Sequence, residues 1–143
     1  MNEDAQIHPE MAFSNFQMEG RGRGVGIKDV DIDIEVVPAD TWVVGSAKSD
    51  DLLKHEQGHY DIVAICAQEM YKAFRGLVGT STRDLQTKLD RVKHRLAQKV
   101  TEVDARYDVR TNHSRNTAVQ QTWDARIAST KANPNGSLDD LPG

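Results

Sequence analysis

The sequence lacks the features that mark several large classes of protein. It has a single cysteine, so no internal disulfide can form and the fold must depend on its apolar core or on a metal ion. Its longest apolar run, Ile62 to Ala67, has six residues, whereas a membrane-spanning helix needs about 18. Basic residues are in the minority, 18 against 22 acidic ones, and the net charge of −4 argues against nucleic-acid binding. We therefore expect neither a membrane span nor a nucleic-acid partner.

The composition otherwise suits one globular domain. Hydrophobic residues make up 38% of the 143 positions and charged residues 28%, which is polar but compatible with a packed core. Residues 1–10 contain neither a basic nor an apolar segment, so we expect no signal peptide in this chain. Residues 133–143 (NPNGSLDDLPG) are rich in turn-forming residues. We predict a single domain over residues 1–132 and a disordered C-terminal tail over residues 133–143.

The N-terminal third has the pattern of a small antiparallel sheet. Apolar and acidic residues alternate from Asp29 to Val37, as in a strand with one buried and one solvated face. Residues 41–44 predict a second, short strand and residues 11–18 a weaker one. The glycine-rich stretch over residues 20–26 predicts a mobile connection between strands.

The remainder of the chain has helical periodicity. Apolar residues recur at intervals of three and four through a first helix that we place between an N-cap at Ser49 and a stop at Gly76. A second helix begins at Ser81, and its apolar stripe extends to Tyr107. A third helix begins near Ser114. The predicted fold class is therefore α+β, a small antiparallel sheet followed by three helices.

The first predicted helix carries an H-E-x-x-H motif, from His55 to His59. The spacing puts both imidazoles on one helix face, where they can share a zinc ion while Glu56 acts as a general base. The motif arises by chance in roughly one of a hundred chains of this composition. Both histidines lie on the buried stripe, where an imidazole without a partner is costly. Two core histidines bonded to backbone carbonyls are the simpler alternative, but we expect one zinc ion per chain.

A catalytic zinc site has three protein ligands and leaves a fourth position for water. His113 lies in the predicted break between the second and third helices, from which it can reach back to the first. Asp104 and Asp108 flank the buried stripe of the second helix and are the alternatives. We expect His55, His59 and His113 to hold the metal.

Two further residues point to the surroundings of this site. Tyr107 lies six residues before His113, and its phenol can donate a hydrogen bond to the oxyanion that forms during acyl transfer. The alternative is a core tyrosine with its hydroxyl at the surface, while Asp108 can also orient a ligating imidazole. Gly58 weakens a helix by about 1 kcal/mol relative to alanine, which indicates that another group closely approaches that turn.

Two blocks of the sequence resemble a bacterial family of small, predicted secreted zinc-dependent proteases. In LLKHEQGHYDI, an aromatic residue and an aspartate follow HEQGH, at Tyr60 and Asp61. In YDVRTNHSRNTAVQQTWDARI, the family's Tyr-Asp, Thr-x-His and Gln-x-x-Trp motifs fall at Tyr107 and Asp108, Thr111 and His113, and Gln120 and Trp123. The resemblance covers roughly residues 30 to 130. It implies a zincin-like fold with the metal motif on the first long helix, His113 as a ligand, and a secreted or periplasmic location. Family members often have glycine after that histidine, where this chain has Ser114.

These observations predict a zinc-dependent endopeptidase that acts on a peptide or protein substrate. Glu56 would accept a proton from the zinc-activated water that attacks the scissile carbonyl, and would pass it to the leaving amine. One alternative is a non-catalytic domain whose structural zinc site is closed by Asp104 or Asp108. Another is a zinc amidase that uses the same ligands on cell-wall peptide crosslinks.

Overall fold

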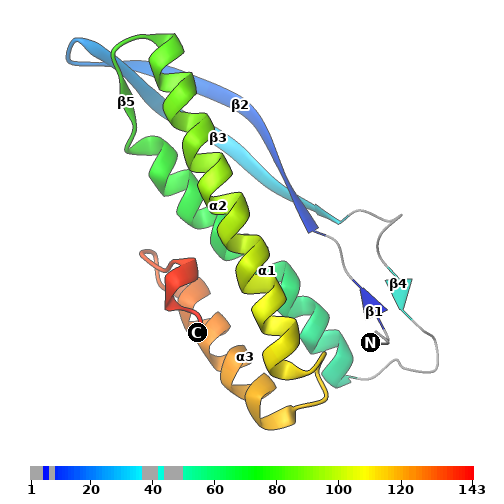
Figure 1. Cartoon of the computed structure of the whole chain (residues 1–143). Coiled ribbons are helices and arrows are strands. Elements are labelled where there is room, and N and C mark those ends of the chain that lie inside the picture. Colours follow the sequence, from blue (N-terminus) through cyan, green and yellow to red (C-terminus); the bar gives the residue numbers. More distant parts are fainter. Residues whose placement is uncertain (1–4, 7–8, 37–41, 44–49) are drawn as a thin grey trace.

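The computed structural model describes residues 5–6, 9–36, 42–43 and 50–143 (Figure 1). In chain order, its elements are β1 (Ala5–Gln6), β2 (Pro9–Arg21), β3 (Gly24–Val36), β4 (Trp42–Val43), α1 (Asp50–Arg75), β5 (Val78–Gly79), α2 (Thr82–Thr111), α3 (Thr117–Ala132) and a 3₁₀ helix, η3 (Leu138–Asp140). Strands β2, β3 and β5 form an antiparallel sheet in that order, and β1 pairs with β4. The predicted α+β class, a small antiparallel sheet with three helices after it, is confirmed.

The sheet is dominated by one long β-hairpin. Strands β2 and β3 pair from Pro9 and Val36 down to Arg21 and Gly24. The predicted strand at residues 29–37 is thus confirmed up to Val36, beyond which residue 37 lies outside the described part of the chain. Two residues of the second predicted strand, Thr41 and Val44, also lie outside the described part of the chain. The predicted N-cap Ser49 lies outside it as well. The short β5 was not predicted, because two residues give no periodicity.

The prediction that residues 20–26 form a mobile connection is wrong. A tight turn joins the strands there, and Gly22 takes a positive φ of 61° that glycine adopts without steric cost. The guanidinium of Arg21 donates hydrogen bonds to the carbonyl oxygens of Arg75 at the end of α1, of Leu77 and of Ile27. These contacts attach the hairpin to the C-terminal end of α1.

The helices begin close to the predicted positions. Ser81 caps α2, and its hydroxyl accepts a hydrogen bond from the backbone N–H of Asp84 at 3.1 Å. Helix α3 begins at Thr117, three residues later than predicted, because Asn116 provides its N-cap and accepts from the backbone N–H of Val119. No helix within the described residues is long and apolar enough to cross a membrane.

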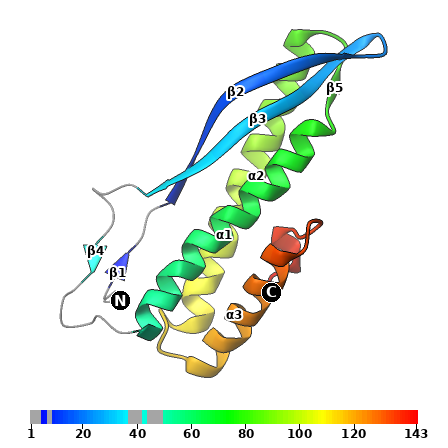
Figure 2. The ribbon, with the colours of Figure 1, turned by 180° about the vertical axis from the view of Figure 1, so that it is seen from behind.

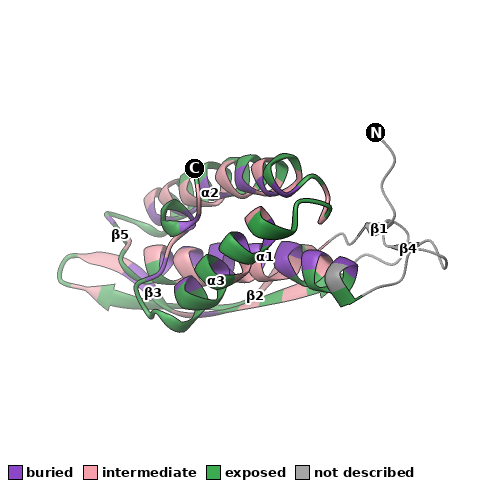
Figure 3. Ribbon diagram, turned by 90° about the horizontal axis from the view of Figure 1, so that it is seen from below, coloured by how far each residue is buried: buried purple, intermediate pink, exposed green. Residues whose placement is uncertain are grey.

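Helix α1 is the central element of the molecule. The β2–β3 hairpin lies along one side of it and α2 lies on another, while α3 packs beside the N-terminal half of α1 (Figures 2 and 3). The buried core lies between these layers and includes Ile27, Ile62, Phe74, Leu85, Leu96, Val103 and Trp123. The end of α1 that carries the histidine motif is therefore surrounded by α2 and α3.

The C-terminal tail is folded, which contradicts the prediction of disorder over residues 133–143. Leu138 and Leu141 are buried in the core, 0% and 5% exposed. The backbone N–H of Leu138 donates to Glu69 of α1 at 3.0 Å, and Arg106 of α2 donates to the carbonyl of Pro142 at 2.9 Å. Residues 133–143 have the composition of a turn, but the two buried leucines and these hydrogen bonds attach the segment to the helices.

Candidate metal centre

His55 and His59 lie together on the face of α1 that is turned toward α2. Both imidazoles are buried, and their ring centroids are 5.0 Å apart with the planes nearly perpendicular. Their Nε2 atoms converge on one atom, Asp108 Oδ1 of α2, at 2.9 Å from His55 and 2.7 Å from His59. The four-residue spacing thus brings both rings to a common point.

The other ring nitrogen of each histidine has its own acceptor. His55 Nδ1 lies 2.8 Å from Gln120 Oε1 of α3, and His59 Nδ1 lies 2.8 Å from Asp104 Oδ1 of α2. Because an amide oxygen and a carboxylate only accept hydrogen bonds, both Nδ1 atoms carry a proton. Histidines that bind metals through Nε2 are commonly held in this way, with Nδ1–H donated to a fixed acceptor.

The charges in the cluster reinforce one another. Burial disfavours protonation of His59, but its hydrogen bonds to Asp104 and Asp108 outweigh that effect and raise its pKa to about 10. Burial likewise disfavours ionisation of Asp108, but its hydrogen bonds with His55 and His59 hold its pKa below the ordinary value. The two groups therefore form an ion pair at neutral pH.

His113 reaches the cluster from the loop between α2 and α3. Three successive residues there, Asn112, His113 and Ser114, have positive φ values of 49°, 52° and 79°. Such a run is strained, because each side chain approaches the following carbonyl. It turns the His113 ring toward α2, where Nδ1 lies 3.7 Å from Asp108 Oδ1. His113, the expected third ligand, and Asp108, one of its alternatives, thus lie side by side.

The candidate ligand atoms form two overlapping groups. One consists of His55, Asp108 and His113 and the other of His55, Glu56 and His59, and within each group the ligand atoms lie within 4.8 Å of one another. Imidazole nitrogens and carboxylate oxygens are the donors that zinc takes in catalytic sites. The donor set and the fixed Nδ1 protons therefore fit the predicted ion. Asp104 belongs to neither group, since it contacts the far side of the His59 ring.

Tyr107 has a different position from the one expected. Its side chain is fully buried, and its ring stacks on that of His55 at 4.5 Å. Its hydroxyl donates to the His55 carbonyl oxygen at 2.8 Å and accepts from Gln120 Nε2 at 2.8 Å. Because its only proton is already donated, the role of oxyanion donor is not supported, and the alternative of a surface hydroxyl is also wrong. A Cβ on Gly58 would overlap with this hydroxyl, which confirms the close approach indicated there.

Sequence reasoning missed the function of Gln120 and Thr111. Both side chains are buried, at 5% and 0% exposure. Gln120 contacts His55, and Thr111 Oγ1 lies 3.4 Å from the same Nδ1 atom. The signal was present in the family-like Thr-x-His and Gln-x-x-Trp motifs, but spacing alone does not assign a partner 65 residues away.

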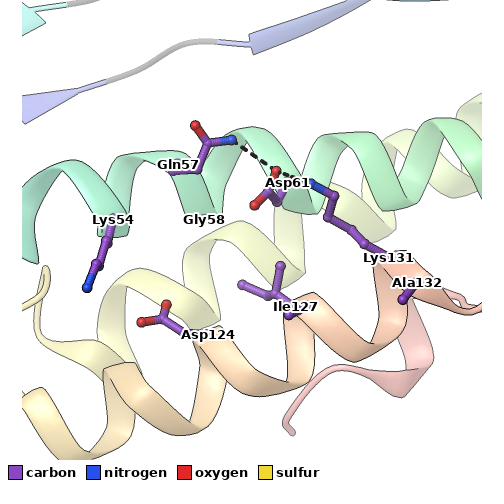
Figure 4. Close-up of a pocket in the computed structure, with 9 residues that line it drawn as sticks. Lys54, Gln57, Gly58, Asp61, Asp124, Ile127, Lys131 and Ala132 are labelled. Atoms are coloured by element: carbon purple, nitrogen blue, oxygen red, sulfur yellow. Dashed lines mark hydrogen bonds and ion pairs between the residues drawn. The ribbon is translucent and has the colours of Figure 1, made fainter.

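A groove lies between α1 and α3, beside this cluster (Figure 4). Its volume is about 660 Å³, and Gly58 is among the residues that line it. Charged side chains line it, Lys54 and Asp124 toward one end and the ion pair of Asp61 with Lys131 toward the other. Of the described residues that line this groove, none is a candidate metal ligand.

Comparison with protein families gives a match over most of the chain. The model of a family described as "Bacterial protein of unknown function (DUF922)" matches residues 10–114, well over half of the chain. The matched range includes the hairpin, α1, α2 and His113, and ends before α3. Comparisons with curated proteins and with solved structures found no match. The resemblance to a bacterial family is confirmed at that level, and the protease activity stays a prediction.

Proposed function

The chain belongs to the DUF922 family of bacterial proteins, and we propose that it is a zinc-dependent hydrolase that cleaves peptide bonds. The observation that carries the proposal is the arrangement of His55 and His59. Their Nε2 atoms converge within 2.9 Å of one carboxylate oxygen. Their Nδ1 atoms are held by two separate acceptors. Metal-binding histidines commonly have Nδ1–H donated to a fixed acceptor while Nε2 faces the ion, and both rings have such an acceptor at Nδ1.

The contacts favour Asp108 as the third ligand. Donor atoms of a tetrahedral zinc site lie about 3.3 Å apart, from bonds of about 2.0 Å. Asp108 Oδ1 is 2.7 and 2.9 Å from the two Nε2 atoms, so an outward shift of a few tenths of an ångström gives that spacing. His113 is the next candidate, because its Nδ1 lies 3.7 Å from Asp108 Oδ1 and its ligand atom lies within 4.8 Å of those of His55 and Asp108. With His55, His59 and Asp108 as ligands, a fourth position would remain for water.

Glu56 is the residue that would move the proton. When bound, zinc lowers the pKa of water to near 7 and polarises the substrate carbonyl. The Glu56 carboxylate lies within 4.8 Å of the ligand atoms of His55 and His59, which is within reach of a bridging water. It would accept the proton of the attacking water and deliver it to the leaving amine.

The ligand set is tested by zinc content in three purified variants, Asp108→Asn, His113→Ala and Asp139→Asn. The Asp139 side chain is 70% exposed and pairs with Lys99, which is not a member of the cluster, so it serves as the control. We expect about one zinc per wild-type chain, a loss in Asp108→Asn, and retention in His113→Ala and in the control. Loss in His113→Ala alone would instead make His113 the third ligand, as the sequence predicts.

The competing function is a closed, structural zinc site in a non-catalytic domain. It is favoured by the proximity of His113, which can fill the fourth position. Loss of zinc in both His113→Ala and Asp108→Asn would support it. Glu56→Gln separates the two functions, because a hydrolase retains its zinc and loses turnover of a mixed peptide library, measured by mass spectrometry. A wild-type protein without zinc after reconstitution would contradict both.

A further inference from the structure

Gln120 lies at the centre of a buried hydrogen-bond network that connects α3 to the histidine motif. We propose that Asp124 and Gln120 are positioning residues, which hold the His55 imidazole in the form with its proton on Nδ1. Its Nε2, which lies 2.9 Å from Asp108 Oδ1, is then the ring nitrogen that is left to bind the metal. This inference rests on the proposed zinc site and adds two residues outside the range that the family model matches.

Asp124 determines which way the Gln120 amide faces. Gln120 Nε2 lies 2.8 Å from Asp124 Oδ1. An ionised carboxylate only accepts hydrogen bonds, so the NH₂ end of the amide must face it. The second hydrogen of the same NH₂ group is donated to the Tyr107 hydroxyl at 2.8 Å. Both amide hydrogens are used, and the oxygen is turned toward His55.

The amide oxygen in turn determines the protonation of His55. Gln120 Oε1 lies 2.8 Å from His55 Nδ1 and has no hydrogen to give, so the ring nitrogen must be the donor. Thr111 gives independent support. Its hydroxyl donates to the Tyr107 carbonyl at 2.7 Å, which leaves its oxygen to accept from the same Nδ1 at 3.4 Å. An imidazole that keeps its proton on Nδ1 offers only Nε2 to a metal.

Burial makes this network difficult to replace. Gln120, Tyr107 and Thr111 are at most 5% exposed, so water does not substitute for a missing partner. Asp124 is the half-buried end of the network and lines the α1–α3 groove (Figure 4). Loss of a group that orients a ligating histidine typically weakens metal affinity 10- to 100-fold.

The test compares Gln120→Leu, Asp124→Asn and Asp61→Asn. Asp61 lines the same groove but pairs with Lys131 and Gln57, outside the network, so it is the matched control. Zinc affinity is measured by competition with a chromophoric chelator. We expect about a 10- to 100-fold loss in Gln120→Leu and a several-fold loss in Asp124→Asn, whose amide can present either end to Gln120. The control should bind zinc like the wild type.

A second measurement separates positioning from a general effect on folding. Long-range ¹H–¹⁵N spectra of the zinc-loaded protein should show His55 protonated at Nδ1 in the wild type, and a shifted or exchanging Nδ1 signal in Asp124→Asn. Asp124→Asn preserves the volume of the side chain. If Gln120→Leu does not fold, the zinc affinity and the Nδ1 signal of Asp124→Asn decide the question.

The outcomes are distinguishable. Zinc affinities equal to wild type in both network variants, with an unchanged Nδ1 signal, would overturn this inference and leave the zinc site standing. A wild type that binds no zinc would overturn the site and the inference together. Weakened binding in both network variants, with normal binding in Asp61→Asn, supports the positioning role.

Discussion

The buried polar residues around the histidine motif form a hydrogen-bond network in which donors and acceptors are matched. Asp104 and Gln120 accept from the two histidines, Tyr107 donates to a backbone carbonyl, and Thr111 donates to another. Buried networks of this kind favour one arrangement, because rotating one of these side chains leaves a buried group without its partner. The geometry around the candidate metal position is therefore already determined by the protein alone.

Ser114 is a residue whose backbone conformation disfavours its side chain. Its φ of 79° lies in the left-handed region, where a Cβ atom costs roughly 1 kcal/mol and glycine does not. We expect Ser114→Gly to raise the free energy of unfolding by about 1 kcal/mol, measured by urea denaturation. Ser129→Gly, at an exposed position inside α3, should lower it by about 0.5 kcal/mol. A loss of stability in Ser114→Gly would contradict the strained loop.

Cys66 gives the molecule a specific pH dependence. Burial raises the pKa of its thiol from 9.0 to about 12. The folded pKa lies above the unfolded value, so the stabilising contribution is complete below pH 9 and is lost as the pH rises toward 12. Between pH 9 and 10.5, wild-type stability should fall by about 1.6 kcal/mol more than that of Cys66→Ala, since the slope approaches 1.36 kcal/mol per pH unit only above the unfolded pKa.

The measurement is the free energy of unfolding in urea at both pH values, for wild type and Cys66→Ala. The other titrating groups are common to the two proteins, so the double difference isolates the thiol. Parallel pH profiles would show that the thiol is accessible to water in the folded protein.

Among the secondary-structure elements, those with long periodic patterns were predictable. Helices α1 and α2 present apolar residues at helical intervals over many turns, and β3 alternates strictly, so local sequence determines them. The turn at residues 20–26 was misjudged because its order depends on Arg21 and its contacts with the end of α1, more than 50 residues away. Likewise, the histidine pair was predictable from spacing, whereas Gln120 as the partner of His55 depends on how α3 packs.

Arg21 connects the hairpin to α1 through several acceptors at once. Its planar guanidinium donates to the carbonyls of Leu77 and Ile27 at 3.1 and 2.7 Å, as well as to that of Arg75. The ammonium group of a lysine is compact, so it cannot donate to all three carbonyls with the geometry of the planar guanidinium. We expect Arg21→Lys to lose about 1.5–3 kcal/mol of unfolding free energy, which is the contribution of one hydrogen bond to a charged group.

Arg23, in the same turn and exposed, provides the matched control. Arg23→Lys should change the stability by less than about 0.5 kcal/mol. Hydrogen exchange of the β5 amides adds an independent readout, because Arg21 bonds Leu77 next to that strand. Equal stabilities of the two variants would show that the hairpin is held by its apolar face alone.

At the scale of the whole molecule, the candidate site is assembled from elements that are distant in the sequence. His55, Glu56 and His59 come from α1, Asp104 and Asp108 from α2, His113 from the following loop and Gln120 from α3. The packing of the three helices is therefore a condition for the site to exist. The C-terminal segment contributes to that packing, because it contacts both α1 through Glu69 and α2 through Arg106.

Leu138 tests whether this segment is a structural part of the domain. Its side chain is fully buried, so Leu138→Ala should lower the free energy of unfolding by about 2–4 kcal/mol through lost burial and a residual cavity. Leu53→Ala makes the same chemical change at a side chain that is 52% exposed, and should cost less than about 1 kcal/mol. Urea denaturation of both variants gives the comparison. Because the tail contacts α1 and α2, Leu138→Ala should also lower zinc affinity at temperatures where part of the protein has unfolded, while Leu53→Ala should not. Equally small losses of unfolding free energy in the two variants would contradict this role, and would agree with the disordered tail that the composition of residues 133–143 predicts.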